Sequence, residues 1–215
     1  MTLHDNSNAV TERQLLPDVV NALPSNIVLL ADAVNTAGVD PSRFAHLGIA
    51  RPTNAVLTPE FILLDYGSLQ CVVLPGVPRR LQVQVAAGHS LLEARGYALE
   101  LFRFAGNART GGLNFGHRFE FRDAGPPVLH YMNIPAISEL VGADPISVGF
   151  TARFAEGPWR GQLTVSPGAN EREVLVQVNY ERDLPSHDAI PELVDAIEER
   201  NEAQSQLVGR VQWRS

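Results

Sequence analysis

The sequence contains no lysine, because all 17 basic residues of the 215-residue chain are arginine. Without lysine there is no P-loop lysine for a nucleotide phosphate and no lysine to form a Schiff base with pyridoxal phosphate. The phosphate-binding lysine of protein kinases is missing as well. These absences exclude several large classes of nucleotide-dependent and cofactor-dependent enzymes.

Cysteine is almost as scarce, since Cys71 is the only one. One thiol cannot form an internal disulfide, and no zinc-ligand spacing exists. Cys71 lies in the apolar run 69–74, where the pKa of a thiol rises, so we interpret it as packing rather than as a nucleophile. The common catalytic and metal-binding motifs are also missing. We therefore expect no catalytic residue set, no metal and no cofactor, although a site assembled from distant residues stays open.

Positive charge is in deficit, with a formal net charge of −7. Nucleic-acid binding depends on clustered positive charge, so a dedicated nucleic-acid binder is disfavoured, while a local basic face stays open. The first residues form neither a basic start nor an apolar run of signal-peptide length, and no membrane-spanning run follows. We expect a cytosolic protein without a membrane partner.

Apolar and polar residues alternate with period two in four runs, which predicts half-buried strands. The last three runs are joined by links too short for a parallel crossover, so we expect an antiparallel meander with one apolar face. The four runs are 113–122, 146–154, 159–165 and 174–180.

A helix after Asp188 is the expected cover for this apolar face. Asp188 is the candidate N-cap, and an apolar stripe follows at helical spacing. The stripe fades after Glu198, and Trp213 is a large apolar residue near the end of a polar tail. Trp213 either packs back on its own domain or contacts another subunit; Leu207 and Trp213 are the candidate interface residues. The stripe consists of Ile190, Leu193, Val194 and Ile197.

The N-terminal half shows a similar order of strands followed by a helix. Gly67-Ser68 is a two-residue hairpin connection, and 81–85 is a further half-buried strand. Ser90 and Glu93 form a capping box for a helix that we expect to end at Gly106-Asn107. The apolar run 26–34 is compatible with either a strand or a buried helix.

These patterns predict an α+β protein with antiparallel sheets, each covered on one face by a helix. We divide the chain into a loose arm with a short helical turn (1–22), an N-terminal lobe (23–105) and a C-terminal lobe (106–215). The same plan, strands and then a helix, occurs in both lobes, so two similar lobes are one hypothesis. The glycine-rich segment 106–112 is either a flexible connector or a ligand-binding loop, and we favour the connector.

Five residues are candidate ligands for a small anion. Arg109 lies in the glycine-rich segment, His117 on the apolar face of the first strand, and the other three on polar strand faces. The alternative that we favour is a solvated ladder in which nearby glutamates neutralise the arginines, with His117 a hydrogen-bonded core residue. The five candidates are Arg109, His117, Arg118, Arg122 and Arg153.

The order of elements in the C-terminal half resembles a sporadically distributed family of bacterial proteins of unknown function. The matching pieces are the arginine-bearing strand 114–122, the segment 128–135 with a tyrosine and an asparagine before proline, the meander 146–180 and the helix 190–207. The resemblance implies a bacterial origin and carries no activity or site residue.

Three functions are compatible with these observations. The first is a non-enzymatic binding or assembly protein that associates with itself or with another protein through strand edges, the closing helix or Trp213. The second is a small-ligand receptor or enzyme with a site between the lobes, near Arg109, His117 and Arg118. The third, disfavoured by the net charge, is a nucleic-acid-associated protein of a defence or regulatory complex.

Overall fold

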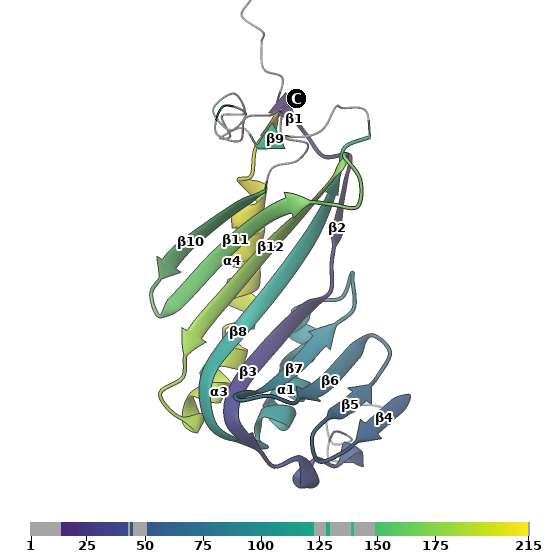
Figure 1. Cartoon of the computed structure of the whole chain (residues 1–215), viewed down its shortest axis with the longest axis vertical. Helices are drawn as coiled ribbons and strands as arrows, with labels where there is room; N and C mark the ends of the chain where they lie inside the picture. Colours follow the sequence, from purple (N-terminus) through teal and green to yellow (C-terminus); the bar gives the residue numbers. More distant parts are fainter. Residues whose placement is uncertain are drawn as a thin grey trace, which may run out of the picture.

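The structure, a computed structural model, describes residues 14–42, 44, 51–122, 128–129, 139 and 149–214. A ten-stranded antiparallel sheet dominates this part of the chain, and three helices lie behind it on one face (Figure 1). The fold is therefore α+β, as predicted. Along the main path the strand order is β10-β11-β12-β8-β3-β7-β6-β5-β4, and β2 also pairs with β8.

The large sheet is built from β2 (Val19–Ala22), β3 (Ser25–Val34), β4 (Asn54–Leu57), β5 (Ile62–Asp65), β6 (Leu69–Leu74), β7 (Arg79–Val85), β8 (Ala105–Glu120), β10 (Phe150–Glu156), β11 (Trp159–Pro167) and β12 (Glu173–Asp183). The helical elements are η1 (Thr36–Gly38), η3 (Leu91–Ala94), α1 (Arg95–Phe102), η4 (His187–Ala189), α3 (Ile190–Asp195) and α4 (Ile197–Gly209). A small separate sheet joins β1 (Gln14–Leu15), β13 (Trp213–Arg214) and β9 (Val128–Leu129).

The meander and its helical cover are confirmed. Strands β10, β11 and β12 pair antiparallel in sequence order, and β12 pairs with β8. All four residues of the apolar stripe are buried, three of them in α3 and the fourth in α4. The start of the expected second strand, 146–148, lies outside the described residues. The apolar run 26–34, for which strand and helix were both open, lies in β3.

The strand β8 corrects the prediction of a connector between two lobes. Residues 106–112 belong to this 16-residue strand, which pairs with β3 on one side and β12 on the other. The glycines have a packing reason, since a Cβ on Gly111 would lie 2.3 Å from Cδ2 of Leu193 and one on Gly112 would lie 3.1 Å from the Tyr180 carbonyl oxygen. One sheet therefore runs through both predicted lobes. The division into lobes at 23–105 and 106–215 stays a prediction.

The strand order follows the same plan in both halves. In each half the first strand is central, the last strand lies next to it, and the middle strands continue outward: β3-β7-β6-β5 and β8-β12-β11-β10. In each half a serine N-cap, Ser90 or Ser186, then starts a 3-10 turn that leads into an α-helix. The hypothesis of two similar lobes thus agrees with topology, and the two first strands pair with each other at the centre.

Helix starts and ends differ in detail from the prediction. The capping box of Ser90 and Glu93 is present. The second N-cap is Ser186 rather than Asp188, which lies inside the 3-10 turn. Helix α1 ends at Phe102, before Gly106, because Ala105 already pairs with Val34 of β3. Pairing of Ala105 with a strand distant in the sequence therefore ends this helix before the local stop signal Gly106-Asn107.

The expected loose arm is partly ordered. Val19–Ala22 forms β2, paired with β8, in place of the predicted helical turn. Its backbone hydrogen-bonding groups pair with the part of β8 that extends beyond β3. Residues 1–13 of the arm lie outside the described residues.

Candidate functional site

The face of the sheet opposite the helices carries a continuous row of polar residues. Residues that pair across antiparallel strands lie on the same face, so the register of the sheet places one polar residue from each of nine neighbouring strands in line. The row runs Arg153, Gln162, Asn179, Asn114, Asn26, Gln84, Gln70, Asp65 and Asn54. Seven of these nine residues are carboxamides, and each of those offers both donors and an acceptor. We call this surface the open face.

Side-chain hydrogen bonds hold parts of the row in place. At the centre, where the halves meet, Asn114 Nδ2 donates to Asn26 Oδ1 at 2.6 Å. At one end Arg153 Nε donates to Gln162 Oε1 at 3.4 Å. These bonds orient the carboxamides and use only part of their hydrogen-bonding capacity. The row is therefore able to bind further polar groups.

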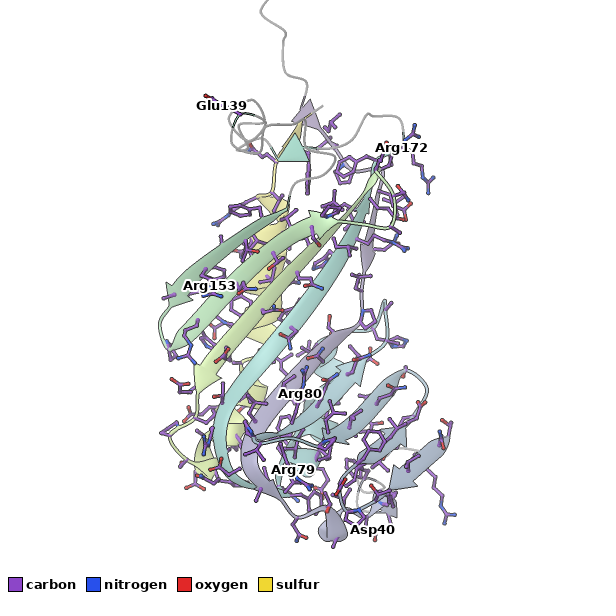
Figure 2. The ribbon with its side chains drawn as sticks, viewed as in Figure 1. Asp40, Arg79, Arg80, Glu139, Arg153 and Arg172 are labelled. Carbon is purple, nitrogen blue, oxygen red and sulfur yellow. The ribbon has the colours of Figure 1, made fainter. Side chains whose placement is uncertain are left out.

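A hollow of about 810 Å³ lies on the open face over the centre of the sheet. Strands β3, β7, β8, β10, β11 and β12 contribute to its walls. Its charged lining consists of Arg80, Arg153, Arg160 and Glu181, so three arginines face one carboxylate. The hollow is therefore positive in a chain whose net charge is −7. Figure 2 labels Arg153 on the upper strands and Arg80 lower on the sheet.

Ion pairs within the chain neutralise one of the three arginines. Arg160 donates two hydrogen bonds of 2.8 Å to Asp183 and one of 2.9 Å to Glu181. The bonds from Arg160 hold the pKa of the Asp183 carboxyl below its ordinary value, and the two carboxylates raise the pKa of Arg160. Arg80 and Arg153 form no ion pair with any described carboxylate, and Nε of Arg80 is buried without a hydrogen-bond partner.

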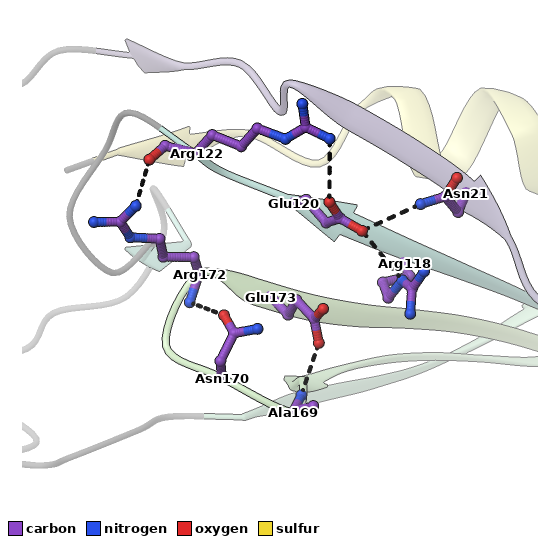
Figure 3. A network of polar contacts seen from close by, with 8 residues as sticks. All are labelled: Asn21, Arg118, Glu120, Arg122, Ala169, Asn170, Arg172 and Glu173. Carbon is purple, nitrogen blue, oxygen red and sulfur yellow. Dashed lines mark hydrogen bonds and ion pairs between the residues drawn. The ribbon is translucent and has the colours of Figure 1, made fainter.

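The predicted ligands Arg118 and Arg122 share the carboxylate of Glu120 in a network of polar contacts (Figure 3). Glu120 lies 3.5 Å from Nε of Arg118 and 3.8 Å from the guanidinium of Arg122. Glu120 also accepts a hydrogen bond of 3.3 Å from Asn21 of β2. The solvated ladder that we favoured from the sequence describes these two arginines.

The site predicted between the lobes does not form. Arg109 pairs with Asp32, and nine residues of one strand, about 30 Å, separate Arg109 from Arg118. His117 lies on the helix side of β8, where its Nε2 is 2.7 Å from Oε1 of Gln204 in α4. These three residues therefore cannot contact one small ligand. Of the five predicted ligands, only Arg153 lines the hollow. Arg80 also lines it but was not predicted. Arg80 follows Arg79 in a short strand flanked by turns, where an arginine gives no local signal of a binding site.

The sequence left open whether Trp213 packs on its own domain or contacts another subunit, and in the structure it packs against its own sheet. Trp213 is 3% exposed, and its ring contacts Phe119 and Phe121 with centroids 5.8 and 5.4 Å apart. Leu207 is partly buried against the same core. Trp213 thus anchors the end of the chain to the sheet and is not on the surface as an interface residue.

Cys71 is completely buried in β6, and burial raises the pKa of its thiol. We expect it to react with a maleimide or a disulfide reagent far more slowly in the native protein than in denaturant. Because it is the only cysteine, the labelled fraction measured by mass spectrometry reports the opening of this core directly. Rapid labelling of the native protein would contradict the burial of β6.

The described part of the chain shows neither a metal site nor a membrane-spanning helix. No group of three or more His, Cys, Asp or Glu residues there could hold a metal ion. No helix among those residues is both long and apolar enough to cross a membrane. His46 and His130 lie outside the described residues. The cytosolic location stays a prediction.

Comparisons with known proteins found no match. No family model fits the sequence, no curated protein is similar to it, and no solved structure matches the fold. The resemblance to a bacterial family of unknown function stays a prediction, and its segment 130–135 lies outside the described residues.

Proposed function

We propose that this protein is a non-enzymatic binding protein that assembles with a second copy of itself through the outer edge of β4. The observation that carries the proposal is the chemistry of the two edges of the ten-stranded sheet. An edge strand presents unpaired N–H and C=O groups, which pair with another strand unless the sequence opposes it.

The two edges differ in their protection. Strand β10 carries charged Arg153 and Glu156, which oppose the approach of another strand. Strand β4 reads Asn-Ala-Val-Leu and has no charge, and all four of its residues are exposed. Val56 and Leu57 are 39% and 49% exposed, and no described strand pairs with the outer side of β4. The uncharged edge is therefore the better site for strand pairing.

A second copy suits this edge because antiparallel pairing of identical strands around a two-fold axis is self-complementary. Four residues provide few hydrogen bonds, so we expect a weak dimer whose population rises with protein concentration. The pairing would extend one sheet into the next and leave both open faces free.

Sedimentation velocity over a range of protein concentrations tests this proposal. We expect Val56→Lys to raise the dimer dissociation constant about tenfold or more, since a lysine on each strand places like charges together. Leu92→Lys is the matched control, because Leu92 is 40% exposed but lies on η3, away from both edges. A monomer at every concentration, or equal effects of the two variants, would refute the edge pairing.

A further inference from the structure

We infer that the hollow on the open face binds an extended acidic segment of a partner protein, with one carboxylate of the segment at Arg80 and another at Arg153. This inference goes beyond the proposed assembly and does not depend on it, because the dimer edge and the open face are different surfaces. Charge, spacing and the chemistry of the lining support it.

The first argument is charge. Arg80 and Arg153 line the same hollow, and neither forms an ion pair with a described residue, whereas Arg109, Arg118, Arg122 and Arg160 all do. Nε of Arg80 is buried without a hydrogen-bond partner, but so are the Nε atoms of Arg118, Arg182 and Arg200, so the missing ion pairs, rather than this nitrogen, set Arg80 and Arg153 apart. A ligand carboxylate would satisfy these arginines with charge-assisted hydrogen bonds.

The second argument is spacing. From β7, which carries Arg80, to β10, which carries Arg153, the sheet order crosses five strand spacings of about 4.8 Å. Arg80 is also four residues from Gln84, the β7 member of the polar row that ends at Arg153. The path along a flat sheet is therefore about 27 Å, and curvature and inward-reaching side chains shorten it. The hollow has the volume of a small-molecule site, but at this backbone spacing a segment with two carboxylates suits the two arginines better than a single small anion does.

The third argument is the lining between the two arginines. Asn114, Asn179 and Gln162 present amide donors and acceptors, which suit the peptide groups of an extended chain. Phe154 and Tyr180 also contribute to the lining of the hollow, but their rings pack against each other on the helix side, where Arg200 also lies over Tyr180. The open face therefore offers no described ring on which a base could stack, which disfavours a single-stranded nucleic acid.

An extended peptide spans this distance with few residues. At about 3.4 Å per residue, and allowing for the reach of the side chains, the two carboxylates would be about five to eight residues apart. Separations of one or two residues are too short to contact both arginines. Peptide length is therefore a direct probe of the geometry.

Fluorescence anisotropy with labelled glycine-serine peptides tests the inference. Each peptide carries two glutamates separated by two, six or twelve residues, and a matched peptide carries two glutamines. We expect the six-residue separation to bind most tightly and the glutamine peptide about tenfold more weakly at low salt, with the difference shrinking as salt rises.

Matched variants locate the binding. Arg153→Gln and Arg80→Gln should each weaken binding of the peptide with the six-residue separation about fivefold. A further peptide with a single glutamate should be sensitive to only one of the two substitutions. Arg210→Gln, which removes one exposed arginine at the end of α4, should leave binding unchanged. Val56→Lys should also bind normally, which separates this inference from the edge pairing.

Several outcomes would overturn the inference. Equal binding of the glutamate and glutamine peptides would remove the role of charge. Peptide binding that does not depend on the separation between the two glutamates would indicate a small-anion site. So would competition in which citrate and a dipeptide of glutamate displace the labelled peptide at the same concentration. Tighter binding of a labelled oligonucleotide, lost in Arg153→Gln, would indicate nucleic acid as the occupant.

Discussion

Gly111→Ala should lower the free energy of unfolding by about 1–3 kcal/mol, the usual cost of overpacking a core. The new methyl group would lie 2.3 Å from Cδ2 and 2.8 Å from Cδ1 of Leu193, which is completely buried in α3. The methyl group therefore pushes α3 away from β8, the strand that joins the two halves. Urea denaturation followed by tryptophan fluorescence measures the loss.

Gly106→Ala is the matched control within the same strand. A Cβ at Gly106 would lie 3.7 Å from the nearest atoms of Ala33, which is ordinary contact, so we expect no loss and a small gain from reduced backbone entropy in the unfolded chain. If both variants lose the same stability, glycine flexibility rather than packing explains Gly111.

A double-mutant cycle isolates the contact further. Leu193→Ala alone should cost about 2–5 kcal/mol, because it leaves a cavity. Combined with Gly111→Ala, it should cost less than the sum of the two single changes, since the new methyl group occupies part of the space that Leu193 vacates. Strict additivity would show that the two residues do not contact each other.

Arg200→Ala should lower the free energy of unfolding by about 2–4 kcal/mol, similar to other truncations of large buried side chains. Arg200 is 4% exposed, and its guanidinium carbon lies 5.3 Å from the ring centre of Tyr180 and 5.7 Å from that of Trp159. Its Nη1 donates to Glu156 at 2.7 Å, and its Nη2 donates to Glu199. The Arg200 side chain therefore connects α4 to all three strands of the meander.

Arg200→Met separates packing from charge. The two carboxylate partners are 53% and 69% exposed, so solvent hydrates them when the arginine is removed, and Nε of Arg200 has no described partner. Methionine keeps most of the apolar stem without a buried charge, and we expect it to cost less than about 1.5 kcal/mol. Glu156→Gln should cost at most about 1 kcal/mol, as for exposed pairs.

Equal losses for Arg200→Met and Arg200→Ala would contradict this account. They would show that the cation over the two rings and its ion pairs, rather than packing, hold α4 in place. The same urea measurement distinguishes the two cases, and labelling of Cys71 checks whether the distant β6 opens with the same free energy.

Local patterns in the sequence determined the class of the fold. Period-two alternation assigned the meander β10–β12 and the face of β8, because a strand with one buried side must alternate. The capping box of Ser90 and Glu93 and the apolar stripe on α3 were equally local signals. The pairing of Arg118 with Glu120 was also predicted, since Glu120 lies two residues away.

Tertiary structure decided what local patterns cannot express. The glycines at 111 and 112 are typical of a loop, and only tertiary contacts, with Leu193 at Gly111 and with the Tyr180 carbonyl oxygen at Gly112, explain why they belong to a strand. Asn26 and Asn114 are 88 residues apart in the chain, and only the register between β3 and β8 places them in one row. Arg80 and Arg153 likewise line one hollow only because five successive strand pairings join β7 to β10 in one sheet. Pairing between distant strands depends on the burial of a shared core, so the position of the open face followed from the whole chain rather than from any one segment.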